Sequence, residues 1–321
     1  MNSPDTTILI SDRAKKQLTR DLGDKILGAL HDPRTVEIML NADGKLWQER
    51  LGETMRCIGT LRGTQAQAIV KIVAGYHGRE LTRNNPTLEC EFPLDGSRFA
   101  GQVPPVVSAA VFAIRKKAVS VFTLDDYVAS GIMTSGQSER IKDAATRRRD
   151  ILVIGGTGSG KTTLVNAVLD YIVTIEPDVR IVIIEDTGEI QCTAKNYIQY
   201  HTSAEVSMTQ LLRTTLRMRP DRIIVGEVRG PEALDLLMAW NTGHEGGVAT
   251  LHANDAKAGL SRLAMLISMH PDSPKPIEPL IGDAVHLIVH IVRTPEGRRV
   301  EEIMEVKGYE NGRYLTETFR E

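Results

Sequence analysis

Cysteine is scarce in this chain of 321 residues, which contains three, at Cys57, Cys90 and Cys192. They lie far apart and form no C-x-x-C pair, which argues against a zinc module and against a disulfide framework. Cysteine usage of this kind fits a protein of the reducing cytosol. We therefore expect a fold held together by its hydrophobic core.

Aromatic residues and excess positive charge are also lacking. Phe, Trp and Tyr make up 4% of the chain, and 39 basic residues face 41 acidic ones, for a formal net charge of −2. Few side chains can stack on bases, and no overall positive field attracts a phosphate backbone. The composition therefore predicts no direct nucleic-acid partner, although Arg147–Arg149 and Arg115–Lys117 could form local basic patches for anionic lipid or a neighbouring subunit.

Long hydrophobic runs are absent too. The best candidates, residues 105–114 and 284–292, are too short to span a bilayer, and the second contains His286 and His290. The first residues carry neither a basic region nor an apolar stretch, so no secretory signal is expected. Any membrane association is predicted to be peripheral.

Against these absences stands a complete G-x-x-x-x-G-K-T segment. An apolar strand pattern at 150–154 precedes it and a helical pattern at 162–169 follows, which is the context that distinguishes a phosphate-binding loop from a chance glycine-rich turn. Glycines let successive N–H groups face one anion at a helix N-terminus. The predicted nucleotide-binding residues are Gly155, Gly156, Thr157, Gly158, Ser159, Gly160, Lys161, Thr162 and Thr163.

The hydrophobic patterning divides the chain. We predict an α+β domain over 1–122, a linker over 123–134, and an α/β domain over 135–321 in which alternating helices and strands imply a parallel sheet with helices on both faces. In the first domain the patterns predict helices at 12–30 and 64–76 and strands at 36–40, 45–50 and 106–114.

Two carboxylates follow apolar strand patterns. Glu185 ends one pattern and Glu227 ends another, and the carboxyl ends of parallel strands are where ligands bind in such sheets. Glu185 could instead belong to a solvated acidic turn, and Glu227 could form an ion pair with a nearby arginine.

Histidines and arginines complete the candidates. His244 and His252 flank a short strand pattern; each could be an ordinary core or turn histidine, and a zinc site is disfavoured because no third ligand is near. Arg98 and Arg115, taken singly, read as surface ion pairs.

Together, these segments in this order resemble the ATPases of the type II/type IV secretion superfamily. Residues 155–162 resemble the family's Walker A motif, 184–187 its aspartate box, 224–229 its Walker B motif and 242–254 its histidine box. Residues 36–41 and 94–98 are similar to segments of the VirB-eleven-like branch, and the overall pattern is most similar to its conjugal-transfer ATPases. The resemblance covers about 36–310.

The resemblance implies a RecA-like P-loop domain behind a smaller N-terminal domain, with ATP and Mg²⁺ as cofactors. It implies that Lys161 binds phosphate, that Thr162 and Glu185 lie at the metal, and that Glu227 positions water. It further implies that His244 and His252 sense the γ-phosphate and that Arg98 and Arg115 complete the site.

The family implies a homo-hexameric ring at the cytoplasmic face of the inner membrane, in contact with inner-membrane components of a secretion machine. Two departures from the family's patterns are notable: the four-cysteine module of many type II enzymes is missing, and no aspartate adjoins Glu227. We predict an ATPase that powers conjugative type IV secretion. The alternatives are a type IV pilus or type II secretion motor, a nucleic-acid translocating motor, and an assembly factor regulated by nucleotide.

Overall fold

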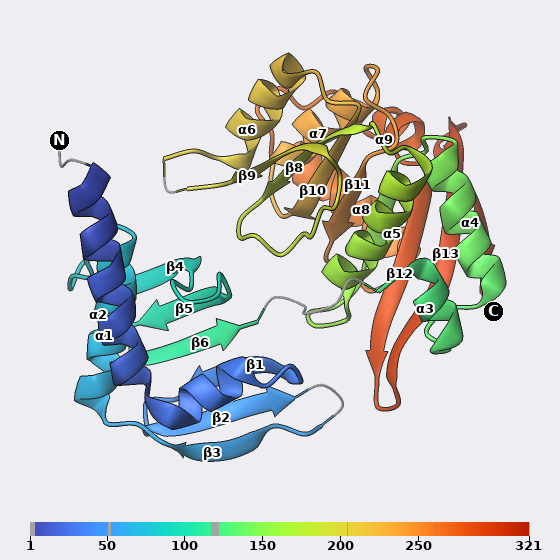
Figure 1. The fold of residues 1–321 in the computed structure, drawn as a ribbon. Coiled ribbons are helices and arrows are strands. Elements are labelled where there is room, and N and C mark those ends of the chain that lie inside the picture. The colour runs from blue at the N-terminus through green and yellow to red at the C-terminus, as the bar shows by residue number, and fades with distance from the viewer. Residues whose placement is uncertain (1–3, 51–52, 117–121, 204, 321) are drawn as a thin grey trace. The chain divides into compact units, whose positions relative to one another are not determined.

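The computed structural model describes residues 4–50, 53–116, 122–203 and 205–320. The chain forms two compact units, residues 1–119 and 120–321, which are described separately below (Figure 1). Lys117, the end of one predicted basic patch, lies outside the described residues.

The first unit is an antiparallel sheet covered on one face by two helices. The strands follow the order β3-β2-β1-β6-β5-β4. Core side chains alternate along central strands such as β1 and β6 and pack against α1 and α2. The elements are α1 (Pro4–His31), β1 (Thr35–Leu40), β2 (Lys45–Arg50), β3 (Arg56–Thr60), α2 (Gly63–Tyr76), β4 (Thr87–Glu91), β5 (Arg98–Gln102) and β6 (Val111–Arg115).

The predicted elements of this unit are mostly observed. β1, β2 and α2 begin and end within one residue of the prediction, whereas α1 starts earlier and contains a kink at Gly23, whose φ of 70° few other residues adopt. The strand predicted over 106–114 begins only at Val111, because the chain after Pro104 and Pro105 first runs through turns and bends.

The second unit contains an eight-stranded sheet of order β14-β13-β12-β7-β11-β10-β8-β9. The strands from β12 to β9 are parallel, and β13 and β14 add antiparallel to the β12 edge. The strands are β7 (Ile151–Ile154), β8 (Arg180–Glu185), β9 (Asn196–His201), β10 (Arg222–Val228), β11 (Val248–Leu251), β12 (Leu287–Thr294), β13 (Gly297–Glu310) and β14 (Arg313–Phe319).

Helices cover both faces of this sheet, as the alternating pattern predicts. One layer contains α6 (Met208–Thr215), which the 3₁₀ turn η1 (Leu216–Met218) extends, with α7 (Glu232–Trp240), α8 (Ala256–Ser268) and α9 (Glu278–Ala284). The other contains α3 (Leu124–Ala129), α4 (Ser135–Thr146) and α5 (Lys161–Ile175). Strand residues alternate between the two layers, so the strands are buried on both faces.

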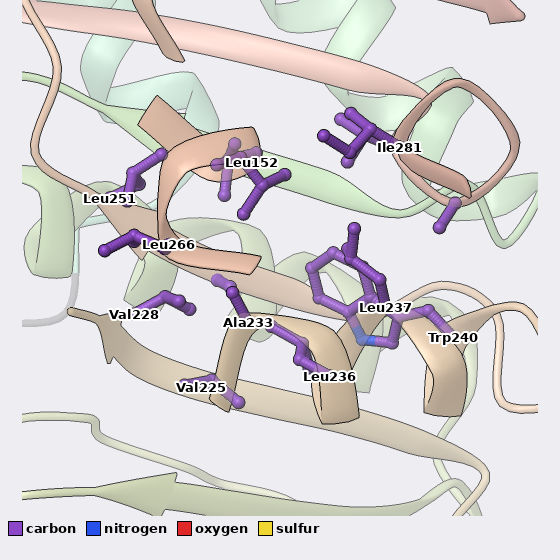
Figure 2. Packing of buried hydrophobic residues seen from close by; sticks show 14 of the residues in the cluster. Leu152, Val225, Val228, Ala233, Leu236, Leu237, Trp240, Leu251, Leu266 and Ile281 are labelled. Carbon is purple, nitrogen blue, oxygen red and sulfur yellow. The ribbon is translucent and has the colours of Figure 1, made fainter. Parts of the chain in front are cut away.

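The core under α7 shows how closely these layers approach. Trp240 is fully buried and donates its indole N–H to the Ile223 carbonyl at 3.3 Å (Figure 2). A Cβ at Gly247 would lie 2.0 Å from the Trp240 indole nitrogen, so only glycine fits where β11 begins.

The segment predicted as a linker, 123–134, carries helix α3 and places Leu124, Tyr127 and Met133 in the core of the second unit. Thr123 caps this helix in a reciprocal capping box with Asp126. Among the described residues no helix is long and apolar enough to cross a membrane.

Candidate functional site

The glycine loop joins the fully buried strand β7 to helix α5. Gly160 precedes the helix with a φ of 100°, which favours glycine, and a Cβ at Gly155 would lie 2.2 Å from the Ile291 carbonyl oxygen. At Gly156, in contrast, a Cβ would meet nothing within 4 Å. The buried Ser159 hydroxyl has no hydrogen-bond partner among the described residues. A close-packed loop with one open side and an unsatisfied hydroxyl fits a bound polyphosphate.

Lys161 lies at the start of α5 and is buried. Its Nζ atom donates to the carbonyls of Gly155 and Gly156 at 3.1 and 3.0 Å, and it lies 3.3 Å from His252 Nδ1. The ammonium group therefore points into the loop, where it can bind phosphate oxygens.

His252 follows β11, next to β7 in the sheet, so its ring reaches the loop from the same edge. Its Nε2 atom lies 2.8 Å from Glu227 Oε1. Partial burial lowers the pKa of His252, and the charge of Lys161 lowers it further, so the neutral imidazole is favoured near pH 7. The contact with the Lys161 ammonium favours the tautomer in which Nδ1 accepts and Nε2 is protonated.

Glu227 lies near the end of β10, and its second carboxylate oxygen meets Arg229 Nη2 at 2.5 Å. Burial alone would raise the pKa of Glu227, but the Arg229 hydrogen bond, the charges of Arg229 and Lys161, and His252 when it is protonated hold it below its ordinary value. Glu227 is therefore ionised at neutral pH, and the ion pair weighed in the sequence analysis does form.

Glu185 is 2% exposed. One of its oxygens accepts the backbone N–H groups of Glu189 and Ile190 at 2.8 and 3.0 Å, and the other accepts from the Gln199 amide. The carboxylate thus holds the turn that follows β8.

That turn brings Glu189 to the loop. The Thr162 hydroxyl donates to Glu189 Oε2 at 3.3 Å. A hydroxyl and a carboxylate are hard oxygen donors, which suit Mg²⁺ together with phosphate oxygens and water. The sequence prediction omits Glu189; its place four residues after Glu185, in a turn that such a buried acceptor can close, is the signal that could have found it.

The structure does not bring His244 to this cluster. Its Nδ1 atom lies 3.0 Å from the Pro220 carbonyl, ahead of β10, whereas His252 follows β11. Because β10 and β11 are parallel, the two histidines lie at opposite ends of these strands.

Arg98 and Arg115 belong to the first unit, where they are direct cross-strand neighbours on β5 and β6. Glu37 stands opposite Arg115 on β1, and Glu91 stands opposite Arg98 on β4. Their predicted role at the nucleotide stays a prediction.

Comparison with known proteins identifies the family. Residues 81–316 match the family described as "Type II/IV secretion system protein". The chain belongs to this family.

Conjugal transfer protein TrbB of Rhizobium radiobacter is 47% identical over 307 residues, 96% of this chain and 94% of that protein. Type IV secretion system protein PtlH of Bordetella pertussis is 32% identical over 292 residues, 80% of this chain and 85% of that protein. In fold, the chain is similar to the Legionella pneumophila ATPase DotB, with a TM-score of 0.62 at 19% identity, covering 87% of this chain and 79% of that one.

The family, the predicted similarity to conjugal-transfer proteins and the predicted fold class are therefore confirmed. This secretion ATPase is an ATP hydrolase. That the loop between β7 and α5 binds its nucleotide stays a prediction.

Proposed function

We propose that this secretion ATPase forms a homo-hexameric ring that hydrolyses ATP to power a conjugative type IV secretion system, at the cytoplasmic face of the inner membrane. The relatives that match nearly the whole chain are conjugal transfer proteins, which supports this system over a pilus or type II motor. The observation that carries the ATPase role is the contact series from Lys161 through His252 to Glu227 at one sheet edge.

The chain's residues divide the chemistry among them. Lys161 and the backbone N–H groups of the loop bind the β- and γ-phosphates, and Thr162 with Glu189 would hold Mg²⁺. The chemistry that the ion would supply there is neutralisation of charge on the phosphate oxygens. The ionised Glu227 carboxylate orients and polarises the attacking water. His252 touches both Lys161 and Glu227, so it can report the presence of the γ-phosphate to the sheet.

Lys161→Ala tests the proposal. It should abolish ATP hydrolysis and weaken nucleotide binding strongly, because a charge-assisted phosphate contact is lost. Cells that carry only this variant should lose conjugal transfer, with the wild-type gene restoring it in the same strain. Near-normal turnover of Lys161→Ala would refute the site. Intact transfer with a loss of pilus retraction would favour the pilus-motor alternative.

A further inference from the structure

Arg229 connects two strand ends beside the nucleotide loop. Its Nη2 atom meets Glu227 Oε2 at 2.5 Å, and its Nη1 atom meets Asp186 Oδ2 at 3.1 Å. Glu227 belongs to β10 and Asp186 directly follows β8, the neighbouring parallel strand. One guanidinium group therefore spans the carboxyl ends of two adjacent strands.

Both ends of this bridge are anchored. The backbone N–H of Arg229 donates to Glu232 Oε1 at 2.7 Å, which fixes Arg229 at the start of α7. On the other side, Asp186 Oδ1 accepts from the Thr202 hydroxyl at 2.8 Å, and the Thr202 N–H donates to the Glu185 carbonyl at 3.1 Å. The planar fork of arginine suits two carboxylates at fixed positions.

The bridge restricts Glu227 in particular. A glutamate side chain has several rotatable bonds, and fixing it costs conformational entropy. In this site Arg229 holds one carboxylate oxygen, while the other lies 2.8 Å from His252 Nε2. Without Arg229, the carboxylates of Glu227 and Asp186 would share this edge with no cation between them, and Glu227 would be free to turn away from the loop.

We infer that Arg229 is a positioning residue for hydrolysis, which aims the Glu227 carboxylate by tying it to Asp186. The inference rests on the proposed role of Glu227. Arg229 acts through Glu227, so its loss should slow the hydrolytic step and leave nucleotide binding almost unchanged.

The surroundings of Arg229 allow its replacement. Its side chain is 47% exposed, and it borders a cavity of about 330 Å³ with a polar lining that includes Asp186, Thr202, Ser207 and Glu232. Water can enter a polar cavity of this size and solvate the carboxylates that the variant leaves behind, so Arg229→Gln is expected to fold.

The test compares Arg229→Gln and Arg229→Lys with Arg213→Gln in the full chain. Arg213 is a matched control because its Nε donates to Asp235 Oδ1 at 2.8 Å and joins α6 to α7, with a side chain 59% exposed. Arg229→Gln should lower kcat by about tenfold or more, since a misaligned base loses much of its effect. The affinity for ADP should stay within about twofold of wild type, because the hydrogen bonds that Arg229 makes to Glu227 and Asp186 lie outside the loop. Arg229→Lys keeps the charge and one contact, so its kcat should be intermediate; Arg213→Gln should match wild type.

Asp186→Asn tests the second half of the bridge. It should lower kcat in the same direction, and the double variant with Arg229→Gln should be no slower than Arg229→Gln alone, because both changes remove one interaction. Independent, additive losses would overturn the bridging role. A kcat for Arg229→Gln equal to that of Arg213→Gln would overturn the inference, and so would a parallel loss of ADP binding.

Glu227→Gln, measured alongside, separates this inference from the proposed function. An inactive Glu227→Gln with a fully active Arg229→Gln would refute the role of Arg229 alone. Full activity of Glu227→Gln would refute the proposed role of Glu227 and the inference together.

Discussion

At the scale of single residues, the glutamate that ends β8 and the glutamate in the turn after it have different tasks. Glu185 is buried and accepts two backbone N–H groups, whereas Glu189 contacts the Thr162 hydroxyl. Sequence patterning favours Glu185 as the metal residue because it ends the strand. In the structure Glu189 is better placed than Glu185 to bind the metal. The carboxylate of Glu185 accepts the backbone hydrogen bonds that close the turn carrying Glu189.

This difference predicts distinct effects of two amide substitutions. Glu189→Gln should raise the Mg²⁺ concentration for half-maximal ATPase activity by about tenfold, because a charged oxygen donor beside the metal becomes neutral. Glu185→Gln should instead lower the free energy of unfolding, by ~1–3 kcal/mol, because the amide serves its N–H and side-chain donors less well. Mg²⁺ titrations and urea unfolding of both variants measure this. If the Mg²⁺ effect occurred in Glu185→Gln alone, Glu185 would be the metal residue after all.

At the scale of elements, Asp150 ties the start of β7 to the turn before β11. Its Oδ1 atom accepts the N–H groups of Gly246 and Gly247 at 2.9 and 2.8 Å, and its carboxylate is fully buried. Oδ2 lies 3.3 Å from His286 Nδ1. Asp150 thus holds β7, which carries the phosphate loop, in register with β11, which carries His252. It does so at the amino-terminal ends of these strands, away from the site.

The buried charge of the Asp150 carboxylate should lower the stability of the folded protein, and the pH dependence of stability should show this. Burial raises the pKa of Asp150 above its ordinary 3.8, although His286 and the two N–H groups oppose the rise. When the pKa of a carboxyl group is higher in the folded than in the unfolded state, the folded protein binds the proton more tightly. The protein therefore loses stability as pH rises through the unfolded and then the folded pKa. An uncharged acceptor at this position should avoid that loss.

Asp150→Asn is therefore expected to be at least as stable as wild type at pH 7, with an advantage that shrinks as pH falls through the raised folded pKa and is gone below the ordinary value of 3.8. Asp150→Ala should lose ~2 kcal/mol at both pH values, because two buried N–H groups lose their acceptor. Urea midpoints at the two pH values provide the measurement. An Asn variant as unstable as the Ala variant at pH 7 would mean that the charge itself holds the two strands together.

Local sequence signals predicted the elements that rest on local chemistry. Strand β7, the loop and α5 form one continuous sequence motif, so the sequence predicts both their fold and their chemistry. His244 and His252 flank one strand, so the sequence already places them at opposite ends of β11. The parallel pairing of β7 and β11, which the sequence does not give, puts the phosphate loop at the end that carries His252. The C-terminal strands β13 and β14 were missed because their half-exposed side chains give a weak pattern.

At the scale of the whole molecule, Arg98 and Arg115 place two positive charges side by side in the sheet of the first unit. Two arginines directly opposite each other on neighbouring strands repel, and Glu37 on β1 and Glu91 on β4 flank them. Burial raises the pKa of Glu37, and the charges of Arg115 and Arg98 lower it. A cationic pair kept at one end of a sheet suits an anionic partner, which we predict to be the nucleotide.

In a closed ring of identical subunits these arginines can act on a neighbour's nucleotide, and mixed rings test this. A subunit carrying Lys161→Ala keeps its arginines, and a subunit carrying Arg98→Gln with Arg115→Gln keeps its phosphate loop. In an equal mixture of the two variants, about a quarter of the interfaces of a head-to-tail ring pair an intact loop from one subunit with intact arginines from the next. If the arginines act between subunits, these interfaces regain a complete site. ATPase activity should then exceed that of either variant alone, while Arg79→Gln, a change at another arginine of the first unit, should leave wild-type activity intact.

Formation of the mixed rings has to be measured together with their activity, by sedimentation of differently labelled subunits in the presence of ATP. Co-assembled rings without recovered activity would show that each subunit's arginines serve its own nucleotide. Subunits that remain monomeric with nucleotide at micromolar concentration would refute the proposed ring itself. Recovery of ATPase activity requires both the ring and the action of arginines across its interfaces. The guanidinium group of a neighbouring subunit can stabilise the transferring phosphoryl group only where the ring brings it within reach.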